Sequence, residues 1–285
     1  MEWERAKNII LIAFILLNLG LASLIYIEDS QYTLTQDRIG NIIKVLDNNN
    51  IQLYTNLARR FAPMRHLDIS GYYYDTPALL TIFFGDANVI QTEPEEGYFV
   101  FVTENDEDGR LEISNGFIYF DNNLFLSENN SESISREDAI KISDEFIQRH
   151  FADYVRDIVF DDYGGVRVGY CQQYRGQLIH TNFIEFFITA DGIAGIELQF
   201  GRVYGYGAEP RMIFAPDEVL LTFMQRVLYM SDEPIFINNM DIVYFQEFAS
   251  DREGSIYPAV PYYRIYTNVN DLPFLINAYT NELYE

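Results

Sequence analysis

Cysteine is almost absent from this chain: Cys171 is the only one in 285 residues, so no disulfide can form within the chain. We expect Cys171 to be a small buried or half-buried strand residue, because the acidic sequence offers no electropositive setting for a reactive thiolate. Histidine is nearly as scarce. His66, His150 and His180 stand far apart, without the HxH or HxxxH spacing of metal ligands, so the sequence predicts no metal site and no cofactor.

Basic residues are few as well. The chain has 19 Lys and Arg against 43 Asp and Glu, which gives a formal net charge of −24. A field of this sign repels the phosphates of nucleic acids, and no cluster of basic residues interrupts it. The composition therefore excludes a nucleic-acid-binding role.

Catalytic motifs are also missing, since the sequence contains no GxSxG, P-loop, GxGxxG or HExxH pattern. The segment Glu104–Gly109 resembles the start of a calcium loop, but the twelfth position holds Asn115 where a bidentate Glu is expected, which favours a hairpin tip. Adjacent acids such as Asp161 and Asp162 precede a Gly-Gly pair and indicate a turn. We therefore expect a protein that is not an enzyme.

One long apolar run is present, from Asn8 to Ile27, and it contains no charged residue. A helix of this length spans the ~30 Å hydrocarbon layer of a bilayer. A cleavable signal peptide ending near Leu21-Ala22-Ser23 is the alternative, but the apolar run continues well beyond the ~7–15 residues typical of a cleaved segment. The sequence predicts a retained, single-pass membrane helix at 8–27.

The charges around this run predict its orientation. Arg5 and Lys7 precede it, whereas acids follow it directly, so the N-terminus is expected in the cytoplasm and the body outside. Within the span, the Asn18 amide can hydrogen-bond to a partner helix, and Gly20 and Ala22 are small residues near it.

The segment after the span has features of an α+β protein. It is rich in Tyr and Phe, with 22 of each in the chain, and aromatic residues favour strands. Thr33-Leu34-Thr35-Gln36 resembles a capping box that opens a helix ending near Asp47. The strands predicted next are Asp68–Tyr74, Ala78–Phe84, Tyr98–Thr103, Arg110–Ser114 and Phe117–Asp121.

A polar linker is expected at Leu126–Ser133, and a helix-plus-three-strand unit then occurs twice. Helices are predicted from the Ser135 N-cap to Phe151 and from Pro216 to Tyr229. The strands predicted after the two helices are Val166–Tyr174, Asn182–Thr189, Ile193–Tyr204, Ile242–Phe248, Tyr262–Thr267 and Phe274–Tyr279.

This order predicts an α+β fold in which antiparallel sheets are each packed by a helix. The predicted organisation is a cytoplasmic stub at 1–7, the membrane helix at 8–27, an extracytoplasmic α+β domain at 28–128, and a second one at 133–285 built from the two units.

Three stretches resemble a known family. The opening Met1-Glu2-Trp3 is followed by basic residues and an apolar span with a Leu17-Asn18 step. Gly169–Phe187 and Tyr262–Glu282 resemble that family's Tyr-x-Gly turn with an Ile-Glu-Phe strand and its closing hairpin. On these residues the chain resembles the YycI family, and its helix-plus-sheet units also resemble PepSY-type modules.

The resemblance implies a function. YycI-like proteins are extracytoplasmic accessory regulators of the WalK (YycG) sensor histidine kinase; they act with a YycH protein, and their membrane helix contacts the kinase. By position, the candidates for kinase contact are Asn8, Asn18, Gly20 and Ala22. Two alternatives remain open: a PepSY-like envelope protein that restrains a peptidase, and an envelope hydrolase. The sequence leaves open whether the protein activates or inhibits.

Overall fold

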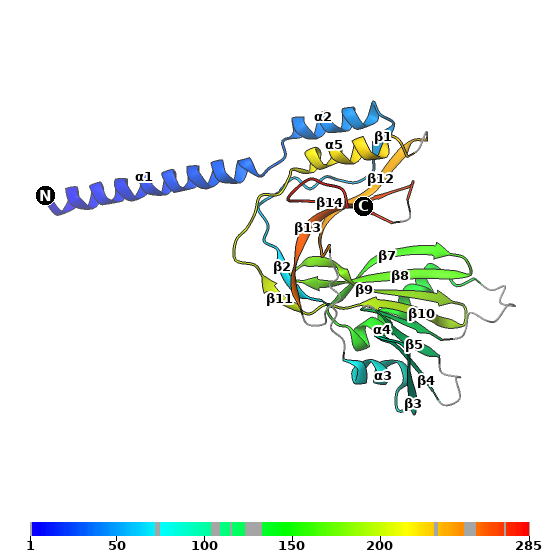
Figure 1. Cartoon of the computed structure of the whole chain (residues 1–285). Helices are drawn as coiled ribbons and strands as arrows, with labels where there is room; N and C mark the ends of the chain where they lie inside the picture. The colour runs from blue at the N-terminus through cyan, green and yellow to red at the C-terminus, as the bar shows by residue number, and fades with distance from the viewer. Residues whose placement is uncertain are drawn as a thin grey trace. The chain divides into compact units, whose positions relative to one another are not determined.

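The computed structural model describes residues 2–71, 75–103, 109–114, 116–122, 133–230, 233–247, 255–270 and 272–284. These residues form an α+β fold, as predicted (Figure 1). Most of the predicted linker and of the calcium-like segment lies outside the described residues, so the domain boundary near 128–133 stays a prediction.

The chain divides into two compact units, each built from separate segments. Unit 1 comprises Met1–Met64, Arg211–Asp241 and Tyr263–Glu285, and unit 2 comprises Arg65–Pro210 and Ile242–Tyr262. Two strands, β12 (Ile235–Phe245) and β13 (Ile256–Thr267), each contribute residues to both units. A unit therefore does not correspond to one continuous stretch of sequence.

Unit 1 contains the N-terminal helices and the last strand. Besides its parts of β12 and β13, its elements are α1 (Glu2–Gln31), α2 (Gln36–Asp47), β1 (Ile51–Leu53), α5 (Pro216–Val227) and β14 (Phe274–Asn277). α2 contacts β1 and α5, and α5 contacts β14. The buried faces of the two helices carry apolar residues at helical spacing: Ile42, Leu46, Val219, Leu220, Phe223 and Val227.

Unit 2 is dominated by an antiparallel sheet. Its elements are β2 (Leu67–Ser70), α3 (Thr76–Phe84), β3 (Val89–Glu95), β4 (Tyr98–Thr103), β5 (Arg110–Ser114), β6 (Phe117–Asp121), α4 (Arg136–His150), β7 (Tyr154–Asp162), β8 (Gly165–Tyr174), β9 (Gln177–Thr189), β10 (Gly192–Gln199) and β11 (Val203–Tyr206). Strands β7-β8-β9-β10-β6-β5-β4-β3 follow one another in hydrogen-bonded order. β12 joins β9 in parallel at Val243 and Tyr244. Within unit 1, the first residues of β12, Ile235–Ile237, pair in parallel with β1.

The core of unit 2 lies between this sheet and the helices α3 and α4. Alternate strand residues point into it, as a half-buried sheet requires. Phe83 of α3 stacks on Phe120 of β6, with 4.6 Å between ring centroids, and Phe146 of α4 meets Phe186 of β9 edge-on at 5.4 Å. These aromatic pairs fix both helices on the same face of the sheet.

The structure confirms several of the predicted elements. Helix α4 begins after the predicted N-cap, where Ser135 Oγ accepts the Asp138 backbone N–H. Cys171 is a buried residue of β8, as expected. The predicted strands Tyr98–Thr103, Arg110–Ser114 and Phe117–Asp121 match β4, β5 and β6.

Other predictions were wrong. Ala78–Phe84 is helical and not a strand, because Asp75 caps the helix by accepting the Ala78 N–H and Pro77 sits in its first turn. The first helix of the body is capped by Thr35 and not by Thr33, since Thr33 forms an extended bridge with Arg60. The predicted strand Ile193–Tyr204 is divided between β10 and β11. Five strands lie between α4 and α5, where three were predicted. The strands β1, β3 and β7 were not predicted.

Candidate interaction surfaces

The apolar N-terminal helix α1 is the first candidate surface. The segment Ala6–Leu24 is long and apolar enough to cross a membrane, by length and composition, and none of it is buried in the protein. All four candidate contact residues lie on α1 and are exposed: Asn8, Asn18, Gly20 and Ala22. Arg5 and Lys7 lie in its first turns. An exposed apolar helix of this length requires a lipid or protein environment.

Helical geometry divides the four candidates between two faces. Asn18 and Ala22 are four residues apart and share a face with Asn8, whereas a step of two residues turns about 200°, which places Gly20 on the other side. Leu11 and Ile15 lie on the same face, so positions 8, 11, 15, 18 and 22 form one stripe with alternating spacings of three and four residues. Such spacing is that of a seam between two packed helices.

Asn18 is the most polar position in the middle of this stripe. Its side-chain amide donates to the Phe14 carbonyl at 2.7 Å, within the same helix. A carboxamide has a second N–H and an accepting oxygen, so Asn18 can also engage a neighbouring helix.

The link from α1 to the body is held by backbone contacts within unit 1. Leu34 N–H donates to the Arg59 carbonyl at 2.6 Å, and Phe61 N–H donates to the Tyr32 carbonyl at 3.0 Å. The Tyr32 and Phe61 rings also meet edge-on at 6.5 Å. The four residues between α1 and α2 are therefore held against the segment 59–61 by hydrogen bonds and a ring contact, which restricts their motion.

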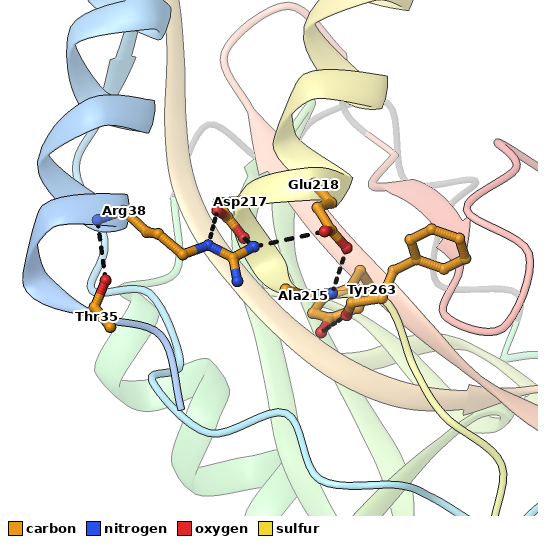
Figure 2. A network of polar contacts seen from close by, with 7 residues as sticks. Thr35, Arg38, Ala215, Asp217, Glu218 and Tyr263 are labelled. Carbon is orange, nitrogen blue, oxygen red and sulfur yellow. Dashed lines mark hydrogen bonds and ion pairs between the residues drawn. The ribbon is translucent and has the colours of Figure 1, made fainter. Parts of the chain in front are cut away.

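An ion-pair network ties α2 to α5 (Figure 2). Arg38 Nε and Nη2 donate to the two carboxylate oxygens of Asp217, both at 2.7 Å, and Glu218 lies 3.6 Å from the same guanidinium. Glu218 also accepts the Ala215 N–H at 3.2 Å, which caps α5. The acids occupy the first turn of α5, where the helix dipole favours negative charge. The pair is bidentate and partly buried, so it fixes how the two helices meet.

The second candidate surface is the sheet face of unit 2 opposite α4. A row of side chains crosses four strands there: Glu112, Tyr119, Glu197 and Glu185, which we term the acidic row. Tyr119 is 41% exposed and the neighbouring Phe117 is 43% exposed. Carboxylates beside exposed aromatic rings suit a partner surface that carries basic side chains.

The carboxylates of the acidic row differ in their charged neighbours. Glu185 accepts from Arg167 Nη1 at 2.7 Å, and Arg167 also pairs with Asp162. Glu197 lies directly opposite Glu185 across β9 and β10. Burial, and then the Glu185 charge, raise the pKa of Glu197, while Arg167 lowers it. The folded state therefore disfavours ionised Glu197.

Glu197→Gln is expected to raise the stability of the folded protein at pH 7 by about 0.2–1 kcal/mol, the usual range for a cross-strand pair. Because the folded pKa is raised, the cost of ionisation is fully present above that pKa and vanishes below the unfolded value, where both states are protonated. Urea unfolding at pH 7 and at acidic pH measures this difference. Glu112→Gln is the control: Glu112 pairs with Arg110 at 2.7 Å, so its neutralisation should bring no gain.

No protein-family model and no curated protein matches the chain, but several solved structures are similar to it. An uncharacterised protein from Eubacterium rectale is similar, with a TM-score of 0.56 and 12% identity over 87% of this chain and 98% of that one. The two proteins share a fold. The identity is too low for this likeness to show more than that.

Two further structures are similar at lower scores. The C-terminal domain of Bacillus megaterium YpeB has a TM-score of 0.44 and 10% identity, over 75% of this chain and 97% of that one. YycH from Bacillus subtilis has a TM-score of 0.46 and 15% identity, over 82% of this chain and 60% of that one. Scores this low carry no conclusion about function.

The fold brings together one group of side chains that the sequence does not signal. Asp157, Cys171 and His180 have their ligand atoms within 4.8 Å of one another, although they come from three different strands. The other two histidines lie elsewhere: His66 is 3.4 Å from Asp68, and His150 packs against Phe146. No sequence spacing signals the group, because pairing between strands brings it together.

Proposed function

We propose that this chain is a membrane-anchored extracytoplasmic accessory protein that regulates a WalK-like sensor histidine kinase together with a YycH-like partner. It acts by protein–protein contact and not as an enzyme. The body lies outside the membrane and the N-terminus inside, in line with the basic residues before the apolar segment 8–27 and the acidic residues after it. The sequence resemblance to YycI-like proteins, strongest at the opening of the chain, supports this role.

The main support for the proposal is that α1 exposes an apolar segment while its C-terminal end is attached to the body. Its apolar segment is wholly exposed, yet the link that follows it is held to the body by backbone hydrogen bonds. A helix of this kind can transmit a contact in the membrane to the folded part outside. To regulate, it must bind two states of the kinase with different affinity.

The test is co-purification from membranes with a WalK-like kinase and a YycH-like protein from the same genome. We expect both partners to be recovered with the native chain. A variant whose 8–27 segment is replaced by an unrelated apolar span should lose the kinase and keep the YycH-like protein.

Point variants in α1 refine this test. Asn18→Leu and Ala22→Leu alter the stripe, and we expect each to lower kinase recovery; the loss of an interhelical hydrogen bond from Asn18 costs roughly 0.6–2 kcal/mol. Ala13→Leu makes the same change as Ala22→Leu on the opposite side of the helix, so it is the matched control and should retain the kinase. Equal losses in Ala13→Leu and Ala22→Leu would contradict a contact through the stripe.

Failure to recover either partner with the native helix would refute the regulatory role. A peptidase recovered in their place, independently of the α1 sequence, would support the PepSY-like alternative.

A further inference from the structure

Cys171 lies between two potential metal ligands on the sheet of unit 2. Its thiol donates to Asp157 Oδ2 at 3.3 Å, and His180 offers a ring nitrogen within 4.8 Å of both atoms. Cys171 is buried, at 3% exposure, whereas Asp157 and His180 are half-buried. The three come from β7, β8 and β9, which are adjacent strands of one sheet.

The strand register is irregular on both sides of Cys171. On one side, β7 carries an extra residue between Arg156 and Ile158, and that residue is Asp157. On the other side, Cys171 pairs with Phe183 but the next residue of β8 pairs with Ile179, so β9 carries an insertion that begins with His180. Bulges re-aim side chains that a regular strand would place elsewhere. Both potential ligands therefore occupy bulges beside the cysteine.

We propose that Asp157, Cys171 and His180 form a binding site for a first-row transition metal of the zinc class. Thiolate, imidazole and carboxylate are the donors that zinc uses in proteins, and three such ligands with a water as the fourth complete a tetrahedron. Ligand atoms at ~2.0–2.3 Å from zinc lie about 3.3–3.8 Å from one another. The Cys171–Asp157 distance already falls at this value.

The surroundings favour such a site. The net charge of −24 attracts cations to the protein surface. The His180 ring packs against Phe245, with 6.0 Å between centroids, which limits its rotation. Partial exposure of Asp157 and His180 gives a metal ion and its water ligand access to the buried sulfur.

The experiment is a titration of the reduced, full-length protein in detergent with Co²⁺, followed by absorption spectroscopy and by displacement with Zn²⁺. We expect one equivalent to bind and a thiolate-to-cobalt charge-transfer band to appear. Cys171→Ser should abolish this band. His180→Gln and Asp157→Asn should each weaken binding by at least about tenfold, the lower limit seen when even an outer partner of a metal ligand is lost.

His150→Gln is the matched control, because His150 is a part-buried histidine of the same unit that packs against Phe146 outside the group. It should bind cobalt like the native chain, and circular dichroism should show every variant folded. Absence of cobalt binding would overturn the proposal. So would binding without a charge-transfer band, or a band that persists in Cys171→Ser. This test is independent of any kinase partner.

Discussion

Asp241→Ala is expected to lower the free energy of unfolding by about 3 kcal/mol or more. Asp241 accepts from Arg264 Nε at 3.0 Å and from Nη2 at 2.7 Å, and the Arg264 side chain is only 1% exposed. The variant removes this carboxylate from a buried guanidinium, and loss of one charged partner from a buried ion pair is costly. Urea unfolding followed by circular dichroism measures the loss.

A double variant separates charge from packing. Asp241→Leu combined with Arg264→Met removes both charges and keeps apolar volume, so it should recover much of the stability that Asp241→Ala loses. Asp161→Ala breaks the exposed pair with Arg136, whose side chains are 67% and 54% exposed, and it should have a far smaller effect. Equal losses in Asp241→Ala and Asp161→Ala would show that burial of Arg264 does not govern the stability of unit 1.

Phe186→Ala should destabilise unit 2 by about 3–5 kcal/mol. Phe186 of β9 is completely buried and meets Phe146 of α4 and Tyr170 of β8 edge-on, at 5.4 and 5.7 Å. Its truncation leaves a cavity between the sheet and α4 that the surrounding strands cannot close. Thermal and urea unfolding of the full chain provide the measurement.

Phe160→Ala is the matched control for this truncation. Phe160 belongs to β7 of the same unit but is 38% exposed, so removal of its ring creates no enclosed cavity. We expect a loss well below that of Phe186→Ala. If the two variants lose the same stability, the packing of α4 on the sheet is not the main source of stability in unit 2.

The accuracy of the sequence predictions followed the strength of the local signals. Helix α4 was predicted closely, because Ser135 caps it and its apolar residues recur at helical spacing. The segment 78–84 was predicted as a strand because a short apolar run suits either structure; its capping Asp75 and Pro77 were the signal that should have decided it. β7 was missed because bulging at Asp157 breaks the alternation of a regular strand.

The sequence by itself determined the apolar anchor candidate, the α+β class and the excess of acidic charge, because length, hydropathy, periodicity and composition are properties of continuous stretches. Only the tertiary structure decided which side chains meet. The Arg38–Asp217 pair joins residues 179 positions apart, Glu197 faces Glu185 through strand pairing, and bulges on two strands bring Asp157 and His180 to Cys171. Strand register and helix packing depend on contacts distant in sequence, so no local pattern specifies them.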